Sequence, residues 1–522
     1  MAVPQEVRDV PRPRGTVVCD GKEGRYPVRE KLSGGYYVDE NGKRHRPSRN
    51  GKVVGYIIDM EFVKREIPDP NLIPIGEVDL KTWGDVELID RLNRDLLELL
   101  ELHFKDDEPL TLYVASVIKA AKNGIPYRLL QREYEESFLT ETLPVVNLRR
   151  THMSDFLRRI GNKVNSVNGF MRMMAGRVEM GEHVIIDGTL RQDHSRVNSL
   201  SEISRKTSKH GYREVSIMYA YSLERMEPIC CKVYPGNMVD QRTIGDFLEE
   251  FEIANGIVVA DKGFPPESLK KQVEESPGLH YILPLKRDRA IIDELGMYVY
   301  DSRLGDESGI QCKKTCWEVD GKKLWYYSFR DPVIAADQEM LYMSHHRGKD
   351  FNADDLNNRR EEFGTMVFES DLDLSSGTVY EIYNSRWVIE ILFKRQESEL
   401  DQDTTRVQSD YNVIADNFIN YLVSIMVSRL LVYFDDRKLL DKNTFGDLMR
   451  VLRRMKMTRV PSDDGWRLNR VAKSDAELVE KMGMLSRPVV PAEVKKKGRP
   501  KGSKDKVPRK KKSKKKLEQP SD

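Results

Sequence analysis

Five polar residues recur at helical spacing in the segment YNSRWVIEILFKRQE, which spans residues 383–397. At about 100° per residue they share one arc of a helix: Tyr383, Arg386, Glu390, Lys394 and Glu397. Most of the remaining circumference is large and apolar, the reverse of an ordinary surface helix. We therefore expect a helix enclosed by protein, with one polar strip facing something wet or charged. A chain of i,i+4 ion pairs would explain the same spacing, at only a few tenths of a kcal/mol per pair, and this segment alone does not separate the two interpretations.

Two aspartates share a second pattern, because each ends a short apolar run. The run HVIID ends in Asp187 and the run IVVAD ends in Asp261, and a glycine-containing turn follows each. Unalternated β-branched runs of this length indicate central strands covered on both faces. Each aspartate is therefore expected at or near the end of a buried strand. Either one alone could be a turn or cap residue, but the two together with Glu390 favour a shared site.

Three carboxylates gathered from two strands and a helix would repel one another strongly unless cations compensated them. Mg²⁺ prefers carboxylate and water oxygens and is commonly held together with substrate phosphates. Two such ions about 3.5–4 Å apart can clamp the attacking and leaving oxygens of an in-line phosphoryl displacement. The pattern predicts two Mg²⁺ or Mn²⁺ ions at Asp187, Asp261 and Glu390. A glutamate would be tolerated on this helix because it faces metal and DNA.

These motifs resemble the DDE transposases of prokaryotic insertion sequences, in the group marked by a Tyr-Arg-Glu-Lys signature on the glutamate helix. The signature is matched by Tyr383, Arg386, Glu390 and Lys394 in the pattern Y-x2-R-W-x2-E-x2-F-K. The resemblance extends over roughly residues 145–435. It includes the segments VIIDGT, PGNMVD, VVADKGF and YILPLKR, in that order.

The resemblance implies an RNase H-like core with a β-rich insertion before the glutamate. It implies a protein that binds the terminal inverted repeats of its element, hydrolyses a phosphodiester there, and uses the freed 3′-OH to attack target DNA. Asp187, Asp261 and Glu390 would hold the metal ions. Arg386 would pair with a phosphate through its planar fork, and Tyr383 would donate to another phosphate oxygen. Because both ends must be cut together, a homodimer on double-stranded DNA is expected.

The chain departs from the family pattern at two places. The last Lys of the signature should lie seven residues after the glutamate, where this chain has Glu397, so Lys394 or Arg395 is the candidate for that phosphate contact. Related enzymes have a Trp upstream of the signature Tyr that helps hold a flipped base. This chain has only Phe363 and Phe368 in that stretch.

The net charge of +2 conceals a strong polarity along the chain. Residues 495–516 contain fourteen Lys or Arg and one Asp, a local charge of +13, so the rest of the chain sums to 2 − 13 = −11. A block of like charge without apolar residues cannot form a core, and it is most useful against a polyanion. Within it the sequence GRPKG resembles an AT-hook, whose Arg, here Arg499, would enter narrow A·T minor grooves. A solubilising or targeting tail is the alternative interpretation.

Composition argues against secretion and against a membrane protein. The first fifteen residues contain no apolar stretch typical of a signal peptide, and the longest apolar run, residues 421–427, is too short to span a bilayer. Five cysteines are an odd number thinly spread in a long chain, which suits a reducing compartment. We interpret all five as structural and expect a cytoplasmic protein associated with the nucleoid of a prokaryote.

Changes in pattern along the chain predict an α/β protein with five regions. They are a β-rich N-terminal region that is a candidate for DNA contact (1–80), a helical region that binds DNA ends (81–180), an RNase H-like catalytic domain (181–440) with a β-rich insertion at about 288–345, a helical C-terminal region (441–494), and a disordered lysine-rich tail (495–522). Two other functions remain open: a non-catalytic DNA-binding protein derived from a transposase, and an RNase H-like nuclease without strand transfer.

Overall fold

The computed structural model describes most of the chain before residue 486. The described residues are 3–21, 24–33, 37–38, 41–45, 48–64, 78–195, 197–203, 213–238, 240–260, 266–287, 289–305, 309–319, 321–346, 351–385, 389–391, 393–394, 400, 404–460 and 465–485. The chain divides into two compact units. One comprises residues 1–79 with 459–465, and the other comprises residues 80–458 with 466–522.

The smaller unit contains a four-stranded antiparallel sheet with the order β1-β2-β5-β6. Its elements are α1 (Gln5–Arg8), β1 (Thr16–Val18), β2 (Tyr26–Ser33), β5 (Ser48–Ile58) and β6 (Glu61–Lys64), with β3 (Tyr37–Val38) and β4 (Arg44–His45) paired separately. Val28 and Ile57 lie at the centre of its small apolar core. The alternation of inward and outward residues on β2 and β5 gives this sheet one buried face.

The larger unit is built on an eleven-stranded mixed sheet with the order β11-β10-β8-β12-β13-β17-β16-β15-β14, to which β18 and β9 add at the edges of β8 and β10. The strands are β8 (His183–Asp193), β9 (Glu202–Ile203), β10 (Arg213–Ser222), β11 (Glu227–Pro235), β12 (Asn255–Val259), β13 (Gly278–Pro284), β14 (Ser302–Arg303), β15 (Gln311–Val319), β16 (Lys322–Arg330), β17 (Thr365–Ser370) and β18 (Thr404–Thr405). The expected α/β class is confirmed at the level of a mixed α/β fold with one large mixed sheet.

The apolar runs in the sequence form the centre of this sheet. Strand β8 pairs in parallel with β12 and antiparallel with β10. The side chains of Val184, Ile185 and Ile186 are fully buried, as expected where both faces of a strand are covered. The segment 297–303 contributes only its last two residues to a strand, β14, whereas the aromatic run at 324–329 lies within β16.

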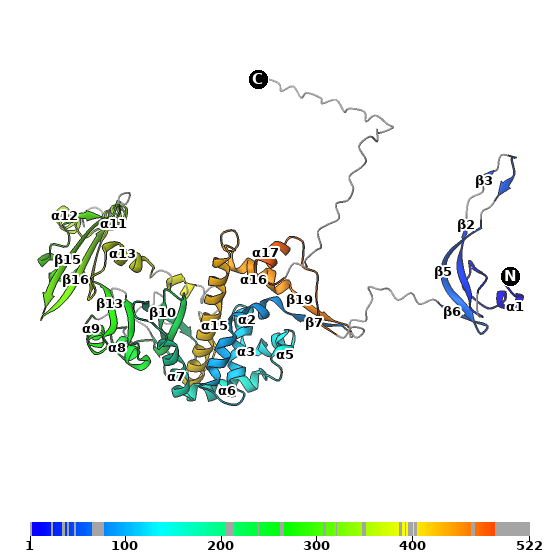
Figure 1. Cartoon of the computed structure of the whole chain (residues 1–522), viewed down its shortest axis with the longest axis horizontal. Coiled ribbons are helices and arrows are strands. Elements are labelled where there is room, and N and C mark those ends of the chain that lie inside the picture. The colour runs from blue at the N-terminus through cyan, green and yellow to red at the C-terminus, as the bar shows by residue number, and fades with distance from the viewer. Residues whose placement is uncertain are drawn as a thin grey trace, which may run out of the picture. The chain divides into compact units, whose positions relative to one another are not determined.

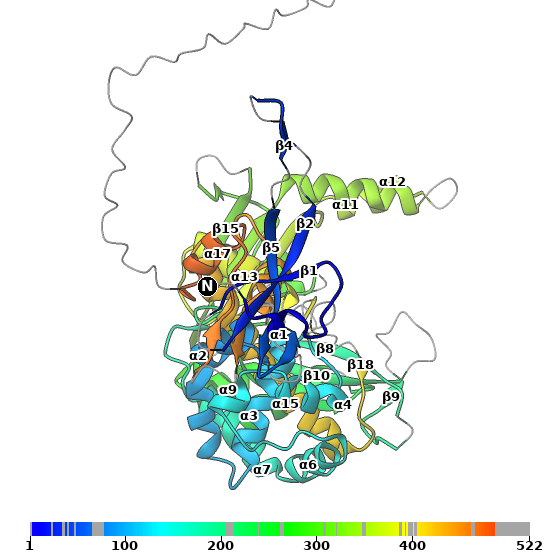
Figure 2. The same ribbon diagram turned by 90° about the vertical axis from the view of Figure 1, so that its right-hand side faces the viewer.

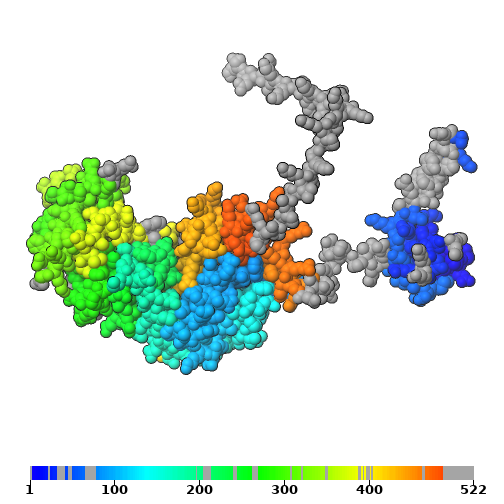
Figure 3. All heavy atoms as spheres, viewed as in Figure 1, coloured from blue at the N-terminus to red at the C-terminus, as the bar shows by residue number. Residues whose placement is uncertain are grey.

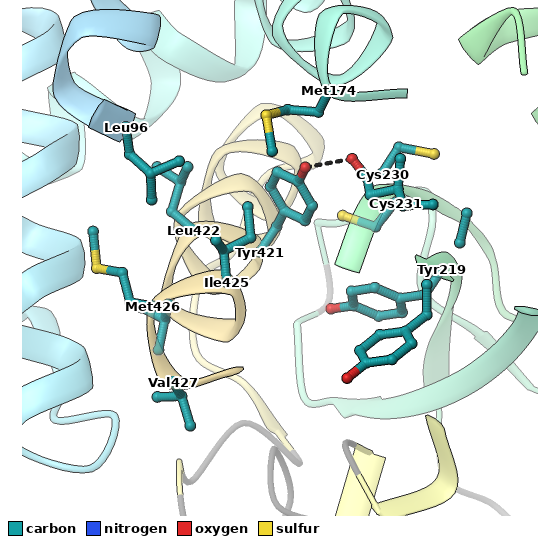
Figure 4. Close-up of a cluster of buried hydrophobic side chains, with 14 of the residues drawn as sticks. Leu96, Met174, Tyr219, Cys230, Cys231, Tyr421, Leu422, Ile425, Met426 and Val427 are labelled. Atoms are coloured by element: carbon teal, nitrogen blue, oxygen red, sulfur yellow. Dashed lines mark hydrogen bonds between the residues drawn. The ribbon is translucent and has the colours of Figure 1, made fainter. Parts of the chain in front are cut away.

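Helices that precede the sheet in sequence pack beside it. They are α2 (Gly84–Glu101), α3 (Glu108–Ala121), α4 (Tyr127–Glu135), α5 (Leu139–Thr142), α6 (Arg150–Asn162) and α7 (Val164–Ala175). The long helix α15 (Asp410–Asp436) runs between these helices and the strands (Figure 1). Tyr421 on α15 donates a hydrogen bond to the carbonyl of Ile229 on β11, and Leu422 and Met426 face α2 across the core (Figure 4).

Helix α15 is also the one helix among the described residues whose length and apolarity would allow it to cross a membrane. Its most apolar window is 78% buried inside the protein. This burial explains the apolar run at residues 421–427, because α15 contacts other elements on most of its circumference. Close packing continues at its first turn, where a Cβ on Gly161 of α6 would lie 1.7 Å from the carbonyl oxygen of Tyr411.

The remaining elements are β7 (Asp79–Thr82), α8 (Asp240–Phe251), α9 (Pro266–Glu275), α10 (Ala290–Glu294), α11 (Pro332–His345), α12 (Ala353–Arg359), α13 (Ser376–Ser385), α16 (Phe445–Arg454), β19 (Lys456–Arg459), β20 (Arg467–Leu468) and α17 (Ala476–Lys481). The C-terminal helices lie against α2, and the space-filling view shows the two parts in contact (Figure 3). Arg91 of α2 donates a hydrogen bond to the carbonyl of Gly483. The lysine-rich tail and Arg499 lie outside the described residues.

Candidate active site

Asp187 lies inside β8, which corrects the expectation that it ends a strand. It is the fifth residue of an eleven-residue strand, because β10 pairs with β8 along this whole stretch, from Val184 to Gln192. The parallel partner β12 pairs only with the first three residues of β8. Asp187 is half-buried, and its Oδ1 accepts a hydrogen bond from the backbone N–H of Gly188 at 2.8 Å. The aspartate therefore marks the point at which the parallel pairing stops and the strand becomes accessible.

The register of β8 and β10 determines which face of the sheet Asp187 occupies. Asp187 lies directly opposite Tyr219, and residues directly opposite each other on antiparallel strands point to the same face. The ring of Tyr219 packs against the ring of Phe393, with 5.6 Å between the centroids. The segment that carries Phe393 therefore covers the same face of the sheet toward which Asp187 points.

Glu390 lies in this segment, one helical turn before Phe393. Residues 389–391 and 393–394 are helical, and side chains three apart lie on neighbouring positions of one helix face. Ile389 is fully buried and Phe393 is 9% exposed, whereas Glu390 and Lys394 are exposed. The described part of this helix thus packs its apolar residues against the sheet and leaves Glu390 and Lys394 exposed. The approach of the Glu390 carboxylate to Asp187 stays a prediction.

Tyr383 is held by aromatic packing. It lies in α13, and its half-buried ring meets Phe368 of β17 edge-on, with 4.5 Å between the centroids. Phe368 is fully buried. Phe363 is 6% exposed and packs against Tyr342. Both phenylalanines are therefore core residues, and neither presents an open ring face for a base.

The other predicted site residues lie outside the described residues. They are Asp261, Arg386, Arg395 and Glu397. Strand β12 ends at Val259, two residues before Asp261, and Val259 pairs with Ile185, two residues before Asp187. The predicted convergence of Asp261 with Asp187 and Glu390 stays a prediction, and this register is the observation that favours it.

The donor atoms of the described residues suit a hard divalent ion. Asp187 and Glu390 would supply carboxylate oxygens, which Mg²⁺ prefers, and the segment that carries Glu390 covers the face of the sheet to which Asp187 points. Within the described ranges no three His, Cys, Asp or Glu side chains are grouped closely enough to hold a metal ion. The third predicted ligand, Asp261, falls outside those ranges. The part of the donor set that the structure describes therefore fits the predicted ions.

Tyr219 and Arg191 are site neighbours that the sequence patterns did not indicate. Arg191 is 4% exposed, and its Nη2 donates a hydrogen bond to the hydroxyl of Tyr219 at 3.2 Å. Tyr219 is fully buried. Only the strand register could have indicated this pair, because it brings together two residues that are 28 positions apart in the sequence. No local motif contains that information. Tyr219 is positioned by Arg191 on one side and supports Phe393 on the other.

Two of the cysteines lie on the next strand, β11, beside Tyr219. Cys231 is opposite Tyr219 on β11, and burial raises the pKa of its thiol to about 12. Burial also raises the pKa of the Cys230 thiol well above its ordinary value. Thiolates are the reactive form of cysteine, so both residues are inert core side chains at neutral pH.

Residues 179–425 match the family described as the transposase DDE domain. The resemblance to DDE transposases is confirmed for this segment, which contains the positions of Asp187, Asp261 and Glu390. Among solved structures, the chain is similar to a piggyBac transposase in a synaptic complex with hairpin DNA. The identity is 13% and the TM-score 0.39, over 71% of this chain and 79% of that chain. No curated protein sequence matches the chain.

Proposed function

We propose that this protein is a transposase that cleaves DNA at the ends of an insertion sequence and joins the freed 3′-OH to target DNA by two-metal-ion phosphoryl transfer. The observation that carries the proposal is the packing of Phe393 against Tyr219, directly opposite Asp187. That contact packs the helix of Glu390 against β10, the strand next to the one that holds Asp187, and it supports the proposal inside the segment that matches the transposase DDE domain.

In this proposal Asp187, Asp261 and Glu390 hold two Mg²⁺ or Mn²⁺ ions. The ions, when bound, supply an activated water and stabilise the oxygens of the phosphate under attack. Arg386 pairs with a DNA phosphate and Tyr383 donates to a second one. Phe393 and Tyr219 keep the glutamate helix in place, because both rings are packed in the core.

The strand order supports an RNase H-like core. Strands β11, β10 and β8 are antiparallel neighbours, and β12 and β13 continue the sheet in parallel with β8. The proposal includes double-stranded DNA as the substrate, two copies of the protein on that DNA, and a cytoplasmic location at the nucleoid of a prokaryote. It also includes membership of the Tyr-Arg-Glu-Lys group, for which Lys394 supplies the described lysine.

The proposal is tested by replacing one carboxylate. We expect Glu390→Gln to keep the fold and DNA binding but to lower Mg²⁺-dependent cleavage by about a hundredfold or more, the usual cost of losing one electrostatic group from a phosphoryl- or acyl-transfer site. The substrate is duplex DNA taken from the sequences that flank the coding region on both sides.

Glu381→Gln is the matched control, because Glu381 is an exposed glutamate on α13, the preceding helix. This variant should cleave like the unaltered protein. Cleavage by purified Glu390→Gln at the unaltered rate would refute the assignment of the glutamate and with it the proposed mechanism.

A further inference from the structure

A basic cavity of about 460 Å³ lies between the helices α3, α4, α6 and α15 and the strand β18. This volume is in the range of roughly 300–1,000 Å³ that is usual for ligand sites. It is lined by Lys119, Gly124, Ile125, Pro126, Tyr127, Arg128, Arg150, Ser154, Leu157, Thr404, Arg406, Val407, Gln408, Asn412, Asp416 and Asn420. None of these residues belongs to the predicted active site. In Figure 2 the labels of β18, α4 and α15, whose residues share the lining, lie near one another.

The cavity lining carries a net charge of +3, since four cationic residues (Lys119, Arg128, Arg150 and Arg406) face one acid, Asp416. The negative charge of that acid is already engaged by the protein. Asp416 accepts hydrogen bonds from the Tyr127 hydroxyl at 2.6 Å and from the Asn420 amide at 3.1 Å, and the ammonium of Lys119 lies 3.6 Å away. A buried carboxylate with this set of partners is internally compensated.

Lys119 reports the electrostatic character of the cavity. Burial lowers its pKa, Asp416 opposes that shift, and the guanidinium groups of Arg191 and Arg406 lower the pKa further. Two arginines therefore oppose the positive charge of this lysine, and one of them, Arg406, also lines the cavity. The surplus positive charge rests on the arginines, because Asp416 offsets the charge of Lys119 itself.

Arg128 and Arg150 account for two of the three surplus positive charges. Both side chains are exposed, and neither has an ion pair or side-chain hydrogen bond among the described residues. Guanidinium groups are suited to phosphate because they offer a planar fork of donors. Arg128 and Arg150 share the lining of this cavity with a third arginine, Arg406. The three guanidinium groups suit an anionic group of the size of a phosphate.

Two helix starts add to the attraction for an anion. Helix α4 begins at Tyr127 and α6 begins at Arg150, and neither has a side-chain N-cap. The first N–H groups of a helix lack partners inside the helix and carry a partial positive charge. Both first residues line the cavity, so the positive ends of two helices lie at the same cavity as the arginine side chains.

The cavity lies on the same face of β8 as Asp187. Arg191 is four residues after Asp187, so both side chains point to that face, and Arg191 acts on Lys119 and Tyr127 of the cavity. Strand β18, which contributes Thr404 to the lining, pairs with Gln192. Gln192 comes five positions after Asp187 on the strand, a distance of about 17 Å at about 3.3 Å per residue.

We propose that this cavity binds a backbone phosphate of the DNA outside the predicted metal site. The inference rests on the proposed function for the identity of the anion. Gly124, which lines the cavity, turns the chain between α3 and α4 with a φ of +72°. It also packs closely against Leu400, because a Cβ on Gly124 would lie 1.5 Å from the carbonyl oxygen of Leu400. This side of the cavity is therefore held in a fixed position.

The test compares two double variants of the full chain. The cavity variant is Arg128→Gln with Arg150→Gln. The control variant is Arg132→Gln with Arg158→Gln, which removes one exposed arginine from each of the same two helices outside the cavity. Equilibrium binding to duplex DNA is measured by fluorescence anisotropy in EDTA at several salt concentrations, and a parallel titration with inorganic phosphate is followed by calorimetry.

We expect the slope of log affinity against log salt to fall in magnitude by about one in the cavity variant and to stay unchanged in the control. Equal slopes in the two variants would overturn the inference. Loss of inorganic phosphate binding without a change in the DNA slope would also overturn it, since the cavity would then take a free phosphate. Thermal unfolding of both variants shows whether the fold is kept.

The outcome is separate from that of the cleavage test. DNA binding in EDTA measures the contribution of the cavity without any metal ion, whereas the Glu390→Gln experiment measures the contribution of the acidic site to cleavage. A cavity variant with an unchanged slope and normal cleavage would refute the cavity alone. Unaltered cleavage by Glu390→Gln with a reduced slope in the cavity variant would refute the mechanism alone.

Discussion

One face of β8 carries two polar places of opposite charge. Near its middle Asp187 lies on the face that the segment with Glu390 covers, and near its C-terminal end Gln192 pairs with Thr404, which lines the basic cavity. Carboxylates by themselves would repel a DNA backbone. In the proposed function, the cations of the cavity would offset that repulsion and hold the DNA strand.

The two places are also built differently. The acidic site depends on apolar support, because Phe393 and Tyr219 pack beneath a helix whose charged residues are exposed. The basic cavity depends on polar support, because Asp416 is satisfied by Tyr127 and Asn420 in the cavity wall. Changes in packing should therefore affect cleavage most, and changes in charge should affect DNA affinity most.

The largest expected effect on DNA binding comes from removing the lysine-rich tail. Truncation after residue 494 removes fourteen cations, and each neutralised phosphate contributes about 0.9 to the salt slope. We expect the slope on duplex DNA to fall in magnitude by about 3, and affinity for A·T-rich DNA to fall with the loss of Arg499. Discrimination of the element's own ends should persist, because the minor-groove code is degenerate.

The measurement is a set of titrations of full-length and truncated protein on end-containing and unrelated duplexes at several salt concentrations. An unchanged slope would mean that the tail is no DNA-binding arm. Loss of end discrimination would instead place sequence recognition in the tail. Either result would change how much of the DNA contact is left for the cavity.

The next effect tests the apolar support of the acidic site. Phe393→Ala should lower the free energy of unfolding by about 3 kcal/mol, because a nearly buried ring that packs on Tyr219 is lost. Cleavage should fall as well, while the salt slope of DNA binding stays unchanged. Phe393→Leu, which keeps most of the apolar volume, is the milder control.

Chemical denaturation gives the unfolding free energy, and the cleavage assay is run well below the melting temperature. A variant that loses stability but keeps full cleavage would show that the glutamate helix does not depend on Phe393. A change in the salt slope of DNA binding by Phe393→Ala would show that the acidic site and the basic cavity do not act separately.

The smallest effect is expected from a control substitution that is remote from both the acidic site and the basic cavity. Thr444 caps α16 in a capping box with Asp447, so Thr444→Ala should cost about 1 kcal/mol of stability at neutral pH. Hydrogen bonds from Thr444 hold the pKa of Asp447 below its ordinary value. A carboxyl with a depressed folded-state pKa stabilises above its unfolded pKa and loses this contribution as the pH falls through the folded value.

The difference in stability between this variant and the unaltered protein should therefore shrink below about pH 4. Denaturation curves at pH 7 and pH 3 measure it. Cleavage and salt slope should both be unchanged by Thr444→Ala. A change in either would show that loss of stability alone alters the two places, and the effects of Phe393→Ala would then need another explanation.

The sequence by itself determined the transposase resemblance and the residues on which it rests. Strand-like runs ending in Asp187 and Asp261, and a helix pattern centred on Glu390, depend on local order along the chain, and periodicity records local order well. The match of residues 179–425 to the transposase DDE domain agrees with that interpretation. The end of the first strand was misjudged, because pairing with β10 and β18, rather than the apolar run, decides how far β8 extends.

Only the tertiary structure decided which distant residues meet. Tyr219 supports Phe393 because strand register places it opposite Asp187, and no spacing in the sequence contains that information. The cavity is harder still to foresee: Arg128, Arg150 and Arg406 come from three separate segments, each of which by itself resembles an ordinary solvated helix or loop. Their charges act together because α4, α6 and β18 are brought to one hollow by packing around α15, and packing is a property of the whole fold.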